Sequence, residues 1–167
     1  NEYTTMAIPK GDSCVVVCSE TLPSPLSHSL NLGEHLPMVS SALGRAILAF
    51  VEEDELKGYL KRFKPIAYTE HTKMTLDEIR QELKDTRESG ISCVKEEYRL
   101  GITGFAAPVF NVNGRPIASI GVALPTGRNN AAHEERVCAL LLKTANALSR
   151  RLGAKLTASP AEMFKEE

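Results

Sequence analysis

The chain carries side chains that enzymes use for catalysis, but none of them forms a catalytic motif. Ser40 and Ser41 could act as nucleophiles only beside a base, and hydroxyls just before the apolar run 42–50 are typical of helix caps. Glu96 and Glu97 are neighbours, so on a strand they point to opposite faces and form no acid–base dyad. We expect this pair at a solvated or salt-bridged sheet edge. The sequence holds no G-x-S-x-G, H-E-x-x-H, P-loop or G-x-G-x-x-G pattern, and we predict a non-enzyme without catalytic residues.

The cysteines and histidines are scattered along the chain. The cysteines show no C-x-x-C spacing, which favours free thiols and a cytoplasmic protein. These residues are Cys14, Cys18, Cys93, Cys138, His28, His35, His71 and His133. Two alternatives stay open: a zinc site that combines cysteines with a histidine, and a thiol-redox sensor that uses Cys14 and Cys93. A less favoured enzyme that uses Cys93 or Ser41 lacks a convincing base. We predict no metal and no cofactor, and we expect His71 in a polar surface loop.

The segment Ser-Ser-Ala-Leu-Gly at 40–44 is the strongest candidate for binding a small molecule. Small residues at a helix start expose backbone amides at the positive end of the helix dipole, which favours a carboxylate or phosphate. The strand 116–124 alternates bulky and bare residues, with Ser119, Gly121 and Ala123 on its bare face. That face leaves room for a closely packed helix or for a ligand. If the helix start faces it, the two form a pocket for a small organic anion.

Composition indicates one ordinary globular domain. The chain has 167 residues, of which 43% are hydrophobic and 25% charged, and a formal net charge of −1. Such a balance provides no basic field for nucleic acid. We expect no membrane span and no signal peptide. Because the chain opens Asn-Glu-Tyr without an initiator Met, we expect a fragment or a processed product.

Apolar periodicity predicts elements in the order β-β-β-α-α-α-β-β-β-α. The predicted strands are 3–8, 13–20, 26–32, 91–97, 103–110 and 116–124; the helices begin at Ser40 or Ser41, at 52–55, at a Thr75–Glu78 capping box and at Asn129 or Asn130. Gly90 and Gly153 end the last two helices. Asn113-Gly114 predicts a type I′ turn, and Pro108 requires a sheet edge or a bulge.

Hairpins at both ends of the chain predict a particular fold class. Strands joined by hairpins form an antiparallel sheet, and the helices must cover its faces. We therefore predict an α+β domain with a roughly six-stranded antiparallel sheet flanked by helices. Residues 1–153 form this domain, and 154–167 form a C-terminal tail.

Several segments resemble the IclR-type bacterial transcriptional regulators. They are LPMVSSALGRAILAF (36–50), ESGISCVKEEYRLGITGFAAPVFN (88–111), NGRPIASIGVALPTGR (113–128) and LLLKTANALSRRLGA (140–154). The resemblance implies a C-terminal effector-binding domain with a GAF-like fold in a homodimer or homotetramer. It implies contact with DNA only through an N-terminal winged helix-turn-helix domain that this chain lacks, and no contact with a membrane. The implied function is effector sensing in a regulator, by preference a repressor, whose small-molecule effector alters promoter binding.

The resemblance also implies a set of effector-binding residues. They are Met38, Ser41, Ala42, Leu43, Gly44, Val94, Gly104, Ser119, Gly121 and Ala123. Relatives often carry polar side chains at several positions where this chain has valine, glycine or alanine. With most side-chain donors and acceptors missing, we predict a roomier, less polar pocket, in which each polar group buried without a partner costs ~1–3 kcal/mol. It would take an aromatic or medium-length organic acid, with its anionic end at the amides of 42–44. We expect Arg45, Lys95 and Arg99 in solvent.

Overall fold

A computed structural model describes residues 3–20 and 30–156 and confirms the predicted α+β class. In these residues six antiparallel strands form one sheet in the order β3-β2-β1-β6-β5-β4. The strands are β1 (Tyr3–Lys10), β2 (Ser13–Glu20), β3 (His35–Pro37), β4 (Ser92–Lys95), β5 (Ile102–Phe110) and β6 (Pro116–Pro125). The helices are α1 (Ala42–Leu48), α2 (Glu53–Arg62), α3 (Leu76–Ser89) and α4 (Ala131–Arg151), with a 3-10 turn, η1 (Thr126–Arg128), before α4.

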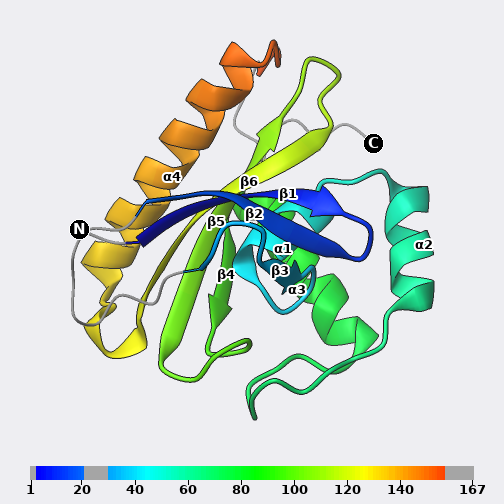
Figure 1. Ribbon diagram of the computed structural model, residues 1–167, viewed down its shortest axis with the longest axis vertical. Coiled ribbons are helices and arrows are strands. Elements are labelled where there is room, and N and C mark those ends of the chain that lie inside the picture. The colour runs from blue at the N-terminus through cyan, green and yellow to red at the C-terminus, as the bar shows by residue number, and fades with distance from the viewer. Residues whose placement is uncertain (1–2, 21–29, 157–167) are drawn as a thin grey trace.

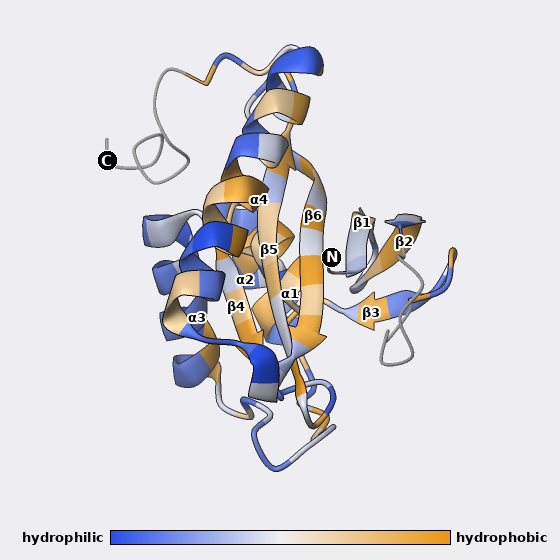
Figure 2. Cartoon of the chain, turned by 90° about the vertical axis from the view of Figure 1, so that its left-hand side faces the viewer, coloured by the Kyte–Doolittle hydropathy of each residue, from blue (hydrophilic) through white to orange (hydrophobic). Residues whose placement is uncertain are grey.

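The helices form a layer on each side of the sheet. α4 lies along one side, whereas α2 and α3 lie on the other (Figure 1). α1 packs against the sheet on the α2–α3 side, where its buried residues join one apolar core. α4 closes a second core against β5 and β6. Hydrophobic residues accordingly concentrate along β4, β5 and β6 between the helices (Figure 2).

The predicted helix caps are confirmed. The Ser41 hydroxyl accepts the Gly44 amide of α1, and Thr75 and Glu78 form the capping box of α3. Gly90 ends α3 in the left-handed conformation, and Asn130 caps α4. The alternation of β6 is also confirmed, because Ala118, Ile120, Val122 and Leu124 face the α4 core. None of the helices among the described residues is long and apolar enough to cross a membrane.

Two details of the predicted strands and turns are wrong. The predicted strand 26–32 lies partly outside the described residues; residues 30–32 belong to no strand, and the strand in this region is β3. The hairpin between β5 and β6 is not a type I′ turn, because Gly114 has a φ of 72° but Asn113 does not enter the positive range. Instead the Asn111 side chain accepts the Asn113 and Arg115 amides, and the glycine is the last residue of a four-residue turn that begins at Asn111.

Pro108 occupies the kind of position that its missing amide requires. β4 begins at Ser92, which pairs with Ala106. Beyond Ala106, β5 pairs with β6 alone, so Pro108 lies where β5 is an edge of the sheet.

The chain stays packed beyond the end of α4. Ala154 is buried, and Leu156 packs against the core on the α1 side. The predicted boundary at 153 itself stays a prediction.

Candidate functional site

A cavity lies between the start of α1 and the centre of the sheet. The volume of the cavity, counted as the space that the centre of a water molecule can occupy, is about 80 Å³. One water needs roughly 10–15 Å³ of such space, so several waters or one compact organic molecule fit. The lining residues come from α1, five strands and three loops: Thr5, Leu30, Leu36, Ser40, Ser41, Ala42, Leu43, Val94, Tyr98, Arg99, Ile102, Gly104, Phe105, Gly121, Val122 and Ala123. Most of this lining is apolar.

The structure brings most of the predicted effector-binding residues together at this cavity. Ser41, Ala42, Leu43, Val94, Gly104, Gly121 and Ala123 line it. Met38, Gly44 and Ser119 do not. Sequence reasoning missed the lining residues from β1, from the loop before β3 and from the loop after β4. Their role in binding stays a prediction for all of these residues.

Both α1 and the cavity lie against the bare face of β6. A Cβ atom on Gly121 would lie 2.9 Å from Leu43 Cδ2, and one on Gly104 would lie 3.2 Å from Ala42 Cβ. The two glycines therefore let the first turn of α1 approach β5 and β6 closely. The cavity occupies the space beside this contact.

Met38 and Gly44 hold the loop before α1 against the helix. A Cβ atom on Gly44 would lie 2.5 Å from the Met38 Cα atom, which only the absence of a side chain avoids. Met38 is buried in the core. These two residues thus position the helix start and do not line the cavity. Ser119 is fully buried two residues along β6 from Gly121, opposite Ala7.

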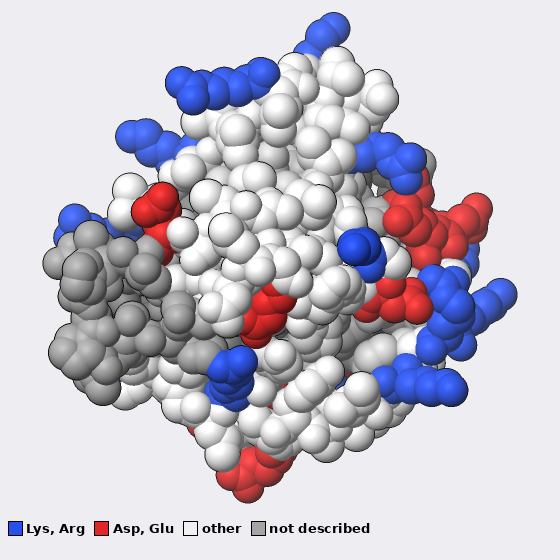
Figure 3. Space-filling view, viewed as in Figure 1, with Lys and Arg blue, Asp and Glu red and all other residues white. Residues whose placement is uncertain are grey.

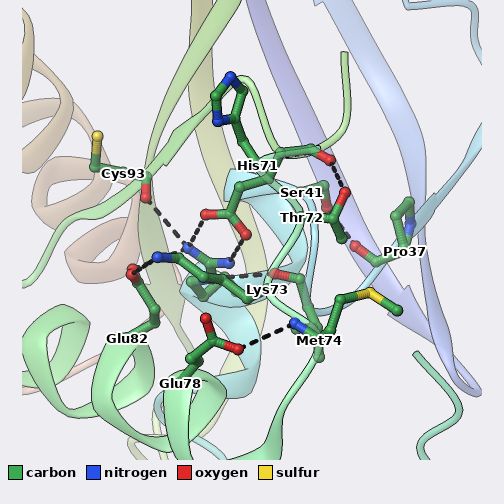
Figure 4. Close-up of polar contacts among 12 residues, drawn as sticks. Pro37, Ser41, His71, Thr72, Lys73, Met74, Glu78, Glu82 and Cys93 are labelled. Carbon is green, nitrogen blue, oxygen red and sulfur yellow. Dashed lines mark hydrogen bonds and ion pairs between the residues drawn. The ribbon is translucent and has the colours of Figure 1, made fainter. Parts of the chain in front are cut away.

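The start of α1 offers two backbone amides. The Gly44 amide is taken by the Ser41 hydroxyl at 3.1 Å, so the predicted anion contact at Gly44 is already occupied. The same hydroxyl donates to the Pro37 carbonyl at 2.6 Å, as drawn in Figure 4. The amides of Ala42 and Leu43 have no acceptor among the described residues, as expected for the first positions of a helix.

Arg99 places a positive charge at the rim of the cavity. It is exposed, as predicted, yet it lines the cavity. Its guanidinium lies 3.6 Å from Glu34 and 5.5 Å from the centre of the Tyr98 ring. Tyr98 in turn meets Tyr68 edge to face at 4.9 Å. Lys95 is exposed, as predicted.

Arg45 is not in solvent, contrary to expectation. Its side chain is 1% exposed and forms two hydrogen bonds with Glu97, at 2.7 and 3.0 Å. It also donates to Glu82 at 3.0 Å, to the Cys93 carbonyl at 3.3 Å and to the Val39 carbonyl at 3.0 Å (Figure 4). The sequence pattern gave no sign of this because charged residues also occupy exposed helix positions. We call Arg45, Glu82 and Glu97 the buried ion network.

The loop before α3 closes over this network. The Thr72 hydroxyl donates to the Glu97 carbonyl at 2.7 Å, and Lys73 lies 3.6 Å from Glu82. Glu97 is therefore buried in an ion pair and is not a solvated edge residue. Glu96 differs from it in having a φ of 59°, and His71 lies 3.7 Å from its carboxylate at the surface. The surface position of His71 is confirmed.

The thiols do not form a reactive cluster. All four cysteines are free. Cys14 is buried 3.9 Å from the Ser41 hydroxyl, and burial raises the pKa of its thiol to about 11. The described residues contain no group of three or more histidine, cysteine and acidic side chains able to hold a metal ion. On the face shown in Figure 3, acidic and basic side chains are interspersed around an uncharged centre.

Comparisons with known proteins agree with this architecture. Residues 1–150 match the family described as bacterial transcriptional regulator IclR, C-terminal. The chain is 33% identical over 126 residues to the DNA-binding transcriptional repressor YiaJ of Escherichia coli, covering 73% of this chain and 44% of that protein. It is 30% identical over 125 residues to the transcriptional repressor IclR of the same organism, covering 75% of this chain and 46% of that protein.

The fold is shared with solved members of the same group. The crystal structure of the Thermotoga maritima IclR superimposes with a TM-score of 0.87 at 28% identity, over 91% of this chain and 62% of that one. The chain spans about half the length of the curated relatives named above. It belongs to the IclR family of bacterial transcriptional regulators and corresponds to their C-terminal domain.

Proposed function

We propose that this chain is the effector-sensing part of a cytoplasmic transcriptional repressor and that its effector is a compact organic acid bound in the cavity beside α1. The observation that carries the proposal is the junction of an apolar cavity with the Ala42 and Leu43 amides. Helix-start amides favour an anion, and the apolar lining favours a carbon skeleton.

The charge around the cavity supports an acid as the ligand. Arg99 lies on the lining, while Arg45 is occupied by carboxylates in the buried ion network. Because carboxylates already neutralise Arg45, the charge that attracts an anion to the cavity over a distance is that of Arg99. An exposed guanidinium raises the local concentration of an anion without fixing it in place.

The lining supports a weakly polar acid over a small hydrophilic one. Val94, Gly104, Gly121 and Ala123 contribute no side-chain donor or acceptor. A two- or three-carbon acid with several oxygens would leave some of them without partners, at a cost of ~1–3 kcal/mol each. An aromatic ring or a chain of medium length exchanges that cost for apolar contact.

The proposed regulation acts through the rest of the full-length regulator. Its N-terminal domain would contact DNA, and the protomers would assemble as a dimer or tetramer. An effector shifts such an assembly only if it binds two arrangements with different affinity. α1 supports this role because it contacts the cavity at its start and the buried ion network at Arg45.

Calorimetric titration and thermal unfolding with a panel of organic acids test the proposal. The panel contains glyoxylate, pyruvate, hexanoate, benzoate and 4-hydroxybenzoate. A ligand at 100 times its Kd stabilises the chain by about 2.7 kcal/mol and raises its Tm by roughly 5–10 °C. We expect this shift for the larger acids. Saturable binding of glyoxylate and pyruvate alone would overturn the ligand class, and binding of none would overturn effector sensing in this cavity.

A pair of glycine variants locates the binding. Gly104→Ala adds a methyl group beside Ala42 Cβ, at 3.2 Å, and narrows the cavity. We expect its Kd to rise roughly tenfold, the effect of about 1.4 kcal/mol. Gly58→Ala, in which the new methyl would lie 3.6 Å from the Arg62 side chain on α2, is the control and should bind as the unmodified chain does. Equal loss in both variants would place the ligand elsewhere.

A further inference from the structure

Thr5 on β1 carries a buried hydroxyl that the fold does not use. The residue is 3% exposed and lines the cavity, yet its Oγ1 has no hydrogen-bond partner among the described residues. Buried hydroxyls are ordinarily paired. Thr5 is therefore the polar side chain of this cavity whose partner is missing.

The neighbours of Thr5 on the same strand face show the contrast. The Tyr3 hydroxyl bonds the Ser19 hydroxyl at 2.6 Å and also donates to the Leu30 carbonyl. Ala7 presents only a methyl group to the core. Valine has nearly the shape of threonine and would fill the Thr5 position without a stranded polar atom. The hydroxyl thus imposes a desolvation cost on the free protein that a bound polar group would offset.

The distance between Thr5 and the start of α1 determines how long a ligand must be to contact both. Thr5 pairs with Gly121 on β6, and β6 separates β1 from β5. Ala42 packs over Gly104 on β5. Ala42 therefore lies over a strand that is two strand spacings, roughly 10 Å, from β1, whereas the Leu43 side chain reaches Gly121 on the strand between them. A carboxylate held at the Ala42 amide does not reach Thr5, but a ring or short chain with a polar group at each end does.

We propose that Thr5 is the residue that reads a second polar group on the effector. Resting on the function proposed above, this makes the effector an organic acid whose hydroxyl or carbonyl oxygen lies at the end opposite its carboxylate. The carboxylate meets the Ala42 and Leu43 amides, and the distant oxygen exchanges a hydrogen bond with Thr5 Oγ1. The apolar body between them contacts the glycine and alanine residues of β5 and β6.

Matched acids with and without the distant hydroxyl test this assignment. The probes are benzoate with 4-hydroxybenzoate and hexanoate with 6-hydroxyhexanoate, each titrated calorimetrically into the chain. We expect the unmodified chain to bind at least one hydroxylated acid roughly tenfold more tightly than its plain partner, the effect of one hydrogen bond. Thr5→Val should abolish that preference while it retains binding of the plain acid. Thr5→Ser, which keeps the hydroxyl, should retain the preference.

Ser92→Ala on β4 is the matched control. Its hydroxyl is also fully buried on the same face of the sheet and has no partner among the described residues, but it lies outside the cavity. Its removal should leave both Kd values unchanged. Without ligand, Thr5→Val should melt at the same temperature as the unmodified chain or higher, because a stranded hydroxyl is replaced by a methyl group.

Three results would overturn the assignment of Thr5. One is an unmodified chain that binds the plain and hydroxylated acids equally, and another is Thr5→Val with the preference intact. The third is a clear loss of Tm in ligand-free Thr5→Val, which would reveal a structural partner for the hydroxyl. In all three the proposed function survives as long as the acids bind. Failure of every acid to bind would overturn the proposed function together with this inference.

Discussion

The two ends of α1 bury polar groups in opposite ways. At its first turn, the Ala42 and Leu43 amides and the Thr5 hydroxyl border an apolar cavity without partners among the described residues. One turn later, Arg45 is equally buried, but its guanidinium bonds two carboxylates and two backbone carbonyls. The first region is incomplete and the second is complete.

The difference separates binding from scaffolding. A buried charge survives only when the surrounding structure satisfies it, so the buried ion network needs nothing from outside the chain. The cavity end holds neutral groups whose missing partners cost less and can be supplied by a ligand. A short helix can therefore be anchored by its later residues and still offer its first residues for binding.

Breaking the ion network should give the largest effect on stability. Arg45→Met removes the guanidinium and leaves Glu97, with 5% of its side chain exposed, as an unpaired buried charge. We expect the free energy of unfolding to fall by about 3–5 kcal/mol in urea titrations. Arg45→Lys should recover only part of the loss, because an ammonium cannot form the two parallel bonds.

An exposed ion pair provides the comparison for this experiment. Lys57 lies near Glu53 and Asp54 on α2, and its side chain is 60% exposed. Lys57→Met should cost less than about 1 kcal/mol. If Arg45→Met costs no more than Lys57→Met, the buried ion network contributes little, and the contrast between the two ends of α1 disappears.

Crowding the junction between the two ends should give the next effect. Gly44→Ala would force a methyl group to 2.5–2.8 Å from backbone atoms of Met38, which cannot move aside as a flexible side chain can. We expect a loss of about 3 kcal/mol, at the upper end for overpacking. Gly58→Ala meets only the Arg62 side chain at 3.6 Å and, inside α2, should be neutral or slightly stabilising. Equal stability of the two variants would contradict the close contact at Gly44.

The sequence could predict those parts of the site that have a strong local signal. Ser41 is a helix cap, and Ser119, Gly121 and Ala123 of β6 follow a period of two. Such signals depend on neighbours in the chain, and they identified the helix start and the bare strand face separately. The order of the strands, with β1 between β2 and β6, arises from pairing far along the chain.

Thr5 and Arg45 show why the rest could not be predicted. Thr5 enters the cavity because β1 pairs with β6, and nothing in TTMAI marks one threonine as unpartnered. Arg45 is buried because Glu82 and Glu97, far away in sequence, converge on it. Likewise Asn113-Gly114 is compatible with a type I′ turn and with the turn observed, and hydrogen bonds to the Asn111 side chain stabilise the observed one. In each case, contacts distant in sequence or made by a side chain override the local pattern.

The smallest expected effect on stability comes from the Cys14 thiol, which stays neutral beside Ser41 at the start of α1. Burial raises the pKa of the Cys14 thiol from 9.0 to about 11, so the folded state keeps its proton where the unfolded chain loses it. This contribution to stability is fully present below pH 9 and is lost as the pH rises towards 11. Between pH 8 and pH 10 the loss of this contribution should lower the free energy of unfolding by about 1 kcal/mol.

Cys14→Ala isolates this contribution from every other group that titrates at high pH. Its absolute stability is lower because a buried side chain is truncated, but its free energy of unfolding should fall less between pH 8 and pH 10 than that of the unmodified chain. Urea titrations at the two pH values give the difference of about 1 kcal/mol directly. Parallel pH dependence in the two proteins would mean that the thiol ionises in the folded state as readily as in the unfolded one. Charge would then be tolerated at both ends of α1, and the separation of a neutral binding end from a charged anchoring end would fail.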